Sequence, residues 1–152
     1  MCHDIYMFIS PLILLLIAVS LSYFISAQFP ILQFTDITIS LIGIILISSG
    51  TGLCLWAIKL FKKHKTTLHP HKKPSKLIVH GPYRMSRNPM YLGCLMISVG
   101  TVLLFANVLA FVGPLIFFGY ISLFVIPIEE AMLTKGFGKS YKGYTKAIRR
   151  WL

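Results

Sequence analysis

Residues 66–93 carry the first set of side chains that could bind a charged ligand. A helix is predicted to begin at Pro89 after the cap residue Asn88, because proline suits a first turn and asparagine suits a cap. Arg84 and Arg87 lie just before this start. Free N–H groups at a helix start attract anions, and arginine binds carboxylate or phosphate through paired hydrogen bonds. The segment therefore favours an anionic ligand, although a basic loop that only contacts lipid headgroups would have the same composition.

The second set is the pair Glu129-Glu130, which directly follows the apolar residues 124–128 and supplies two of the chain's four acidic residues. A carboxylate within hydrocarbon costs at least about 2.5 kcal/mol, so the pair predicts the end of a membrane span. Two interpretations remain open: a solvated helix end, or a paired acidic site for a cation or for sugar hydroxyls. A shared side of the membrane with residues 66–93 favours the acidic site.

Metal chemistry is not favoured by the other polar residues. Four of the five histidines lie close together: His64, His69, His71 and His80. No carboxylate or cysteine lies near them in the sequence to complete a metal site, and the three cysteines show no C-x-x-C spacing. We therefore expect no metal.

The composition of the whole chain is that of a membrane protein. Of its 152 residues, 56% are hydrophobic and 12% are charged, whereas a soluble domain carries roughly 25% charged residues. Disorder is excluded, and a soluble globular fold nearly so. The length predicts a single domain, residues 1–152.

Four apolar segments are predicted to span the membrane, residues 8–29, 37–60, 91–106 and 108–128. About 20 apolar residues in a helix are long enough to cross a bilayer. Only Asn107 separates the short third segment from the fourth, which predicts a tight helical hairpin. The first segment lacks a basic flank and a good cleavage site, so it is interpreted as a retained helix rather than a signal peptide. The predicted fold class is an all-α polytopic membrane protein with four transmembrane helices.

The basic residues predict the orientation. All 15 Lys and Arg lie at or between the second and third segments, or after the fourth. By the positive-inside rule, the loop 61–90, the tail 129–152 and both termini are cytoplasmic. The net charge of +11 then indicates contact with anionic lipid rather than with nucleic acid. A bacterial inner membrane or an endoplasmic reticulum membrane fits this orientation, and the host membrane stays open.

Two further features have two interpretations each. Gly50 and Gly52 in the second span favour close helix packing, the alternative being the flat face of a cofactor. The tail alternates basic and aromatic residues, which is typical of a membrane-surface helix or of a lid over a cytosolic pocket.

Residues 77–93 and 129–150 together resemble the family of integral-membrane isoprenylcysteine carboxyl methyltransferases and phospholipid N-methyltransferases. The first match reads LIV-x-GPYR-x-SRNPMYLG, and the second begins with Glu129-Glu130 and ends with Arg149-Arg150. The resemblance covers about residues 66–150, in the right order around a helical hairpin. It implies an all-helical membrane fold in which the cytosolic loop and the C-terminal tail form a pocket for S-adenosylmethionine.

The resemblance also implies roles for particular residues. It assigns the binding of S-adenosylmethionine to Leu77, Ile78, Tyr83, Asn88, Pro89, Met90, Tyr91, Glu129 and Glu130. Arg87 and Glu129 are the candidate catalytic residues. Many relatives have histidine where this chain has Asn88, which cannot titrate. Prenylcysteine enzymes carry a substrate-binding arginine where this chain has Val125, so Val125 is the candidate substrate-binding residue.

The function expected from the resemblance is methyl transfer from S-adenosylmethionine to a lipophilic acceptor at the cytosolic face, similar to isoprenylcysteine carboxyl methylation. Such an in-line displacement needs alignment more than acid–base help. Membrane lipids are expected partners, and nucleic acid is not. The acceptor is open among a prenylcysteine carboxylate, a phospholipid amine and others, and so is the oligomeric state. The alternatives are a non-catalytic protein that binds anionic lipid and a nicotinamide-dependent membrane reductase.

Overall fold

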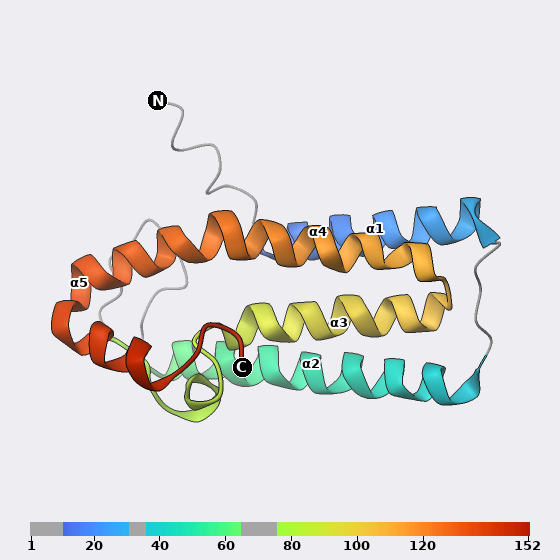
Figure 1. The fold of residues 1–152 in the computed structure, drawn as a ribbon. Helices are drawn as coiled ribbons and strands as arrows, with labels where there is room; N and C mark the ends of the chain where they lie inside the picture. The colour runs from blue at the N-terminus through green and yellow to red at the C-terminus, as the bar shows by residue number, and fades with distance from the viewer. Residues whose placement is uncertain (1–10, 31–35, 65–75) are drawn as a thin grey trace.

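The protein is an elongated bundle of helices (Figure 1). The structure, a computed structural model, describes residues 11–30, 36–64 and 76–152. Its regular elements in these ranges are α1 (Pro11–Gln28), α2 (Ile37–Lys63), η2 (Gly81–Arg84), α3 (Pro89–Phe105), η3 (Val108–Phe111), α4 (Val112–Tyr120), the π-helical turn η4 (Ile121–Val125) and α5 (Ile126–Ala147). All of them are helical, as the sequence predicts.

The helices run along one common direction (Figure 1). Antiparallel α2 and α3 pack side by side, and α1 packs against both α3 and the long helix that begins with α4. Among the described residues, three helices are long and apolar enough to cross a membrane, namely α1, α2 and the helix that continues from Val108 to Ala147. The apolar α3, of 17 residues, is shorter. The protein is thus an all-α polytopic membrane protein.

The helix bounds differ from the predicted spans by one or two residues at the end of α1 and at both ends of α3, and by more at the ends of the second and fourth spans. Helix α2 extends to Lys63, beyond the last apolar residues. The fourth helix does not end at Ile128, because α5 continues through the glutamate pair without a break. The start of the first predicted span, residues 8–10, lies outside the described residues.

Paired glycines let α2 and α3 touch along their backbones. A Cβ atom placed on Gly50 would lie 2.6 Å from the carbonyl oxygen of Gly93, and one on Gly43 would lie 2.8 Å from that of Gly100. Side chains at these positions would force the helices apart. The packing interpretation is confirmed for Gly50 but is wrong for Gly52, where an added Cβ atom would meet nothing within 4 Å.

The predicted hairpin at Asn107 is confirmed. Ala106 ends α3 in the left-handed conformation, with φ of 52°. The side-chain oxygen of Asn107 accepts a hydrogen bond from the N–H of Leu109 at 2.9 Å, and its amide group donates to the carbonyl of Phe29 at 2.7 Å. One buried side chain therefore closes this end of the bundle.

A sharp reversal at the other end folds the tail back onto the bundle (Figure 1). Gly138 has φ of 50° and ψ of −117°, which breaks α5 into two parts. Its second part, residues 139–147, is called the tail helix below. Residues 148–152 follow as the C-terminal strap and end beside the start of α3 (Figure 1). Two segments far apart in the sequence thereby meet at one end of the molecule.

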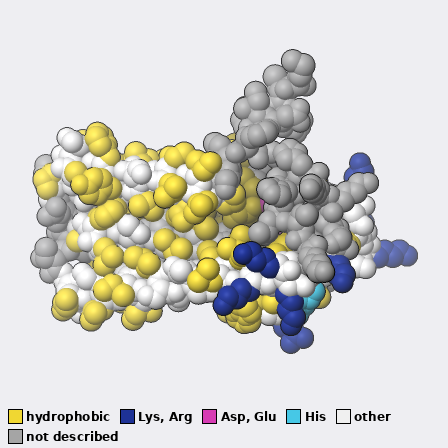
Figure 2. Space-filling view, turned by 180° about the vertical axis from the view of Figure 1, so that it is seen from behind, with side chains coloured by type: hydrophobic (Ala, Val, Ile, Leu, Met, Phe, Trp, Pro, Cys, Tyr) yellow, Lys and Arg dark blue, Asp and Glu magenta, His cyan; other side chains and the backbone are white. Residues whose placement is uncertain are grey.

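The same end carries the positive charge. On the face that Figure 2 shows, Lys and Arg side chains gather at one end, while hydrophobic side chains cover the rest of the bundle. Exposed hydrophobic residues such as Leu16, Ile45 and Leu115 lie on α1, α2 and α4. This distribution suits a bundle whose sides face lipid and whose basic end faces water.

Candidate active site

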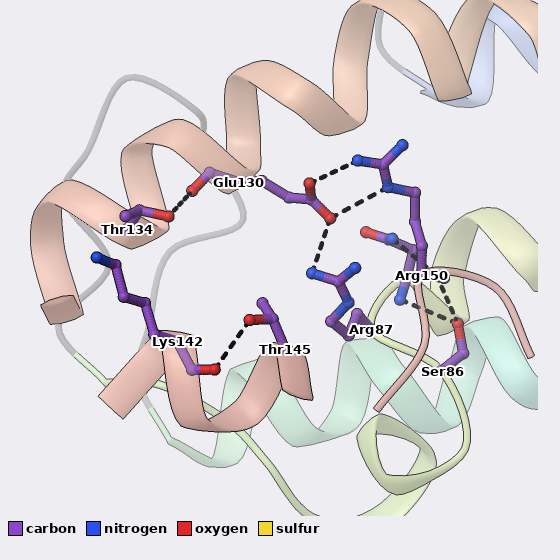
Figure 3. Close-up of polar contacts among 8 residues, drawn as sticks. Ser86, Arg87, Glu130, Thr134, Lys142, Thr145 and Arg150 are labelled. Atoms are coloured by element: carbon purple, nitrogen blue, oxygen red, sulfur yellow. Dashed lines mark hydrogen bonds and ion pairs between the residues drawn. The ribbon is translucent and has the colours of Figure 1, made fainter. Parts of the chain in front are cut away.

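The C-terminal strap is hydrogen-bonded to the loop that leads into α3 (Figure 3). The backbone N–H of Arg87 donates to the carbonyl of Arg149 at 3.1 Å. The carbonyl of Arg150 accepts from the hydroxyl of Ser86 at 3.2 Å and from the side-chain amide of Asn88 at 2.9 Å. These three bonds fix the strap against the first turn of α3.

Asn88 occupies the predicted cap position of α3, but its side chain makes no capping hydrogen bond. Its amide donates to the strap instead, and its own backbone N–H donates to the hydroxyl of Ser86 at 3.1 Å. The prediction that Pro89 begins the helix is confirmed. The position of the cap is thus predicted correctly, but the expected capping hydrogen bond is wrong. The side-chain amide of Asn88 is hydrogen-bonded to the Arg150 carbonyl of the strap instead.

Glu130 joins the loop and the strap through two arginines (Figure 3). Its carboxylate lies 2.9 Å from the guanidinium of Arg87 and 2.7 Å from that of Arg150. The hydrogen bond to Glu130 raises the pKa of Arg150. The side chains of Arg87 and Glu130 are only 14% and 20% exposed. The interpretation of Glu130 as a solvated helix end is therefore wrong.

Glu129 has a different environment from its neighbour. The hydroxyl of Tyr91 donates a hydrogen bond of 2.6 Å to one of its carboxylate oxygens. Within the part of the chain that the structure describes, no Lys or Arg lies at ion-pair distance from this partly buried carboxylate. A buried charge without a counter-charge is unfavourable. Glu129 is thus suited to a positively charged ligand.

A pocket of about 70 Å³ lies between the loop, the first part of α5 and the tail helix. It is lined by Phe61, Lys76, Leu77, Ile78, Tyr83, Arg87, Asn88, Glu129, Glu130, Leu133, Tyr141 and Tyr144. Three predicted cofactor-binding residues, Pro89, Met90 and Tyr91, do not line it. Met90 packs against the buried cluster that includes Ile78 and Tyr83. Tyr91 contacts the pocket only indirectly, because its hydroxyl is hydrogen-bonded to the lining residue Glu129.

Five lining residues were not among the predicted site residues. Tyr141 and Tyr144 lie three apart, a spacing that puts two side chains on one face of a helix and could have indicated them. Leu133 lies one helical turn after Glu129. Phe61 and Lys76 carry no such signal, because only the folded chain brings them together.

The tyrosines of the pocket are fixed and neutral. The hydroxyl of Tyr144 donates to the backbone carbonyl of Tyr83 at 2.7 Å, and the ring of Phe61 meets that of Tyr83 edge-on at 5.7 Å. Burial, with smaller effects of Tyr144 and Glu129, raises the pKa of Tyr83. This phenol is therefore a poor general base at neutral pH.

Val125, the candidate substrate residue, lies in η4 and does not line the pocket. It is partly buried and packs against a core cluster that includes Tyr91, Phe117 and Ile121. Val125 lies one helical turn before Glu129, and its contact with the acceptor stays a prediction.

Two of the four clustered histidines, His69 and His71, lie outside the described residues. The rings of His64 and His80 lie 4.8 Å apart, and His64 bonds to the carbonyl of Leu60. Among the described residues there is no group of three or more side chains that could hold a metal ion.

Known proteins resemble this chain over most of its length. Residues 38–140 match the phospholipid methyltransferase family. A probable protein-S-isoprenylcysteine O-methyltransferase of Oryza sativa subsp. indica is 30% identical over 118 residues, which cover 75% of this chain and 61% of that protein. Protein-S-isoprenylcysteine O-methyltransferase A of Arabidopsis thaliana is 35% identical over 72 residues, 47% of this chain and 36% of that protein.

An uncharacterized protein of Haemophilus influenzae is 41% identical over 63 residues, which cover 41% of this chain and all of that protein. The chain spans about three fifths of the length of the rice relative. No solved structure matches it.

Proposed function

Since this chain belongs to the phospholipid methyltransferase family, we propose that it is an S-adenosylmethionine-dependent membrane methyltransferase that acts on a lipophilic acceptor at the cytosolic face. One observation carries the proposal. The two segments that resemble the family, separated by a helical hairpin in the sequence, line one pocket at the basic end of the bundle.

The lining of the pocket suits the positively charged end of S-adenosylmethionine. Glu129 offers a carboxylate without a counter-charge among the described residues, and Tyr91 holds one of its oxygens in place. Leu77 and Ile78 offer an apolar wall, and Asn88 a fixed amide. The names of the plant relatives, both isoprenylcysteine O-methyltransferases, also support a methyl donor of this kind.

The size of the pocket implies that the tail must move. At about 70 Å³ it is smaller than the roughly 300–1,000 Å³ of sites that enclose a whole small-molecule ligand. The tail helix forms one wall. The tail helix and the strap are held by the hydrogen bond of Tyr144, the ion pair of Arg150 with Glu130 and the packing of Trp151 against the core. We propose that they shift outward to admit the cofactor and close again over it.

Alignment is the chemical task that we assign to these residues. The bound cofactor supplies a methyl group on a positively charged sulfur, which is already a strong electrophile. The chain has to orient that group toward the acceptor and to exclude water, and such positioning can supply much of the rate. We propose that Glu129 acts as the counter-charge and that Arg87, held by Glu130 and the strap, orients the loop and the acceptor.

The acceptor is proposed to reach the site from the bilayer. An apolar groove of about 570 Å³ runs along α2 and α3 and ends at Met85 and Leu152. Met85 directly precedes the loop that holds Arg87, and Leu152 ends the strap. A hydrocarbon tail in this groove would therefore bring its headgroup beside the pocket. An apolar acceptor tail explains why the groove has almost no polar lining other than Ser49.

The proposal is tested by methyl transfer into lipid. Purified protein in lipid vesicles is incubated with methyl-labelled S-adenosylmethionine and a membrane lipid extract, and the labelled product is identified by mass spectrometry. We expect one lipophilic product, and we expect Glu129→Gln to reduce its formation strongly. Absence of labelled lipid with several extracts, together with binding of anionic vesicles alone, would contradict the proposal and support a non-catalytic lipid-binding protein.

A further inference from the structure

Four aromatic side chains surround the pocket that holds Glu129. They are Phe61, Tyr83, Tyr141 and Tyr144, called the aromatic cluster below. Tyr83 and Tyr141 are 8% and 3% exposed, so their rings are largely withdrawn from water. The rings come from three places in the chain: the end of α2, η2 and the tail helix.

The rings of the aromatic cluster are held in fixed orientations. Those of Phe61 and Tyr83 meet edge-on with centroids 5.7 Å apart, and those of Tyr141 and Tyr144 are tilted with centroids 6.2 Å apart. The hydrogen bond of 2.7 Å from the Tyr144 hydroxyl to the Tyr83 carbonyl joins the two pairs. The faces of such rings carry negative electrostatic potential and attract cations.

Among the charges around the pocket, Glu129 is the one that attracts a cation. Glu130 is paired with both Arg87 and Arg150, so this group of three side chains carries one net positive charge and adds no attraction of its own. Glu129 has only the Tyr91 hydroxyl as a partner within the described ranges. Lys76 lines the rim but is exposed, and its ammonium is not at ion-pair distance from Glu129.

We infer that the aromatic cluster and Glu129 form a site for a small onium group, a sulfonium or a methylated ammonium. Aromatic rings bind such groups because their positive charge is spread over methyl groups that are poorly hydrated. The pocket volume of about 70 Å³ suits a group of this size better than a whole nucleoside. The inference rests on the proposed function for its two sources of onium, the cofactor and a methylated amine headgroup.

The tail helix supplies part of the onium site. Two of the four rings, Tyr141 and Tyr144, lie on it, so the site is complete only while the tail helix is folded back at Gly138. Binding of an onium group should thus stabilise the closed arrangement. The uncharged thioether that remains after methyl transfer would lose this attraction, which favours its release.

The test compares choline with its uncharged isostere 3,3-dimethyl-1-butanol. Binding to the full chain in maltoside micelles is measured by ligand-observed NMR, because maltosides carry no onium group. We expect choline to bind more tightly by roughly twofold to thirtyfold, the range of a partly desolvated cation–π contact. Equal binding of the two compounds would overturn the inference, since it would reduce the pocket to an apolar cavity.

A matched pair of variants tests the position of the site. Phe61→Leu removes a ring of the aromatic cluster, and Phe105→Leu removes a ring at the other end of the bundle that also meets its partner, Tyr23, edge-on at 5.7 Å. We expect only Phe61→Leu to abolish the preference for choline, and Phe61→Tyr to keep it. Equal effects of Phe61→Leu and Phe105→Leu would overturn the inference.

Two further arms identify the source of the onium group. If the source is the cofactor, choline competes with S-adenosylmethionine for binding. In that case the native protein also binds S-adenosylmethionine more tightly than S-adenosylhomocysteine, and the Phe61→Leu variant does not. If it is a methylated headgroup, choline binds equally well with S-adenosylhomocysteine present. Methyl transfer without a preference for choline would refute only the onium site. A preference for choline without methyl transfer would refute only the proposed function.

Discussion

Glu129 and Glu130 are neighbours in the sequence but make different contacts. Glu130 holds the molecule together, because two arginines from different segments share its carboxylate. Glu129 has no such partner among the described residues and lies against the pocket. Residues that are poorly compensated in the free protein are often those that bind a ligand. The two glutamates should therefore respond differently to the same substitution.

We predict that Glu129→Gln weakens binding of S-adenosylmethionine by about tenfold to hundredfold, the cost of removing a charged hydrogen-bond acceptor. The thermal stability of the Glu129→Gln variant should be unchanged or higher, because glutamine can still accept the hydrogen bond from the Tyr91 hydroxyl and carries no uncompensated charge. Glu130→Gln should lower stability by about 1.5–3 kcal/mol, because two arginines lose their ion pair. Calorimetry and thermal unfolding measure the two effects. Equal losses of stability would show that the glutamates have the same structural role.

Val125 carries the prediction about the acceptor. It lies one helical turn before Glu129 and offers no charge to a carboxylate. We predict that prenylcysteine analogues are methylated poorly, and that Val125→Arg lowers their KM while Val125→Leu, which adds no charge, does not. Val125 packs on a core cluster, so the arginine variant should also lose some stability. Efficient methylation of a prenylcysteine analogue by the unmodified protein would refute this prediction.

At the scale of elements, the reversal at Gly138 brings Tyr141 and Tyr144 into the lining of the pocket. Its φ of 50° and ψ of −117° lie in a region that only glycine adopts easily. Gly138→Ala should cost about 1–3 kcal/mol of local strain and displace the tail helix. We predict weaker cofactor binding and faster proteolysis after Lys139 and Lys142, with the membrane helices intact.

Gly136 is the matched control for that substitution. It lies two residues earlier within the helix, where an added Cβ meets nothing within 4 Å. Gly136→Ala should leave cofactor binding unchanged and stabilise the helix by up to about 1 kcal/mol. If both variants bind the cofactor as the native protein does, the reversal is not needed for the pocket.

The contact between α2 and α3 gives a second prediction for the elements. Gly50→Ala would place a Cβ atom 2.6 Å from the carbonyl oxygen of Gly93, whereas Gly52→Ala meets nothing within 4 Å. We expect the first variant to be destabilised by about 1–3 kcal/mol and the second to be unchanged or slightly stabilised. Thermal unfolding in micelles compares them, and similar stabilities would mean that the helices are free to separate.

Some elements could be predicted from the sequence, and others only from the folded chain. Continuous apolar runs and caps such as Asn107 are local signals, so the helices and the hairpin follow from them. The continuation of α5 through the glutamates could not be foreseen, because charged residues usually end a span. Likewise the sequence does not indicate that Arg150 pairs with Glu130, because 20 residues and a reversal of the chain separate them.

At the scale of the whole molecule, the pocket, lined by residues from 76–88 and 129–144, lies at the end of the bundle where Lys and Arg side chains gather (Figure 2). The hairpin at Asn107 and the end of α1 lie at the opposite end (Figure 1). The proposed cofactor is water-soluble and the proposed acceptor is lipophilic, so under the proposed function the two would meet where the bundle leaves the bilayer. The orientation of the bundle thus decides which compartment must supply the cofactor.

We predict that the basic end faces the cytoplasm, because lysines and arginines are retained on that side during insertion. Lys142→Cys marks the tail helix, and Val108→Cys marks the opposite end, where the native side chain is 54% exposed. A membrane-impermeant maleimide added to intact cells should label Val108→Cys at once and Lys142→Cys only after permeabilisation. The unmodified chain serves as the background control for labelling of its three native cysteines, of which Cys54 and Cys94 are partly buried. Labelling of Lys142→Cys from outside would place the pocket away from the cytosolic cofactor, and the proposed methyl transfer could not occur there.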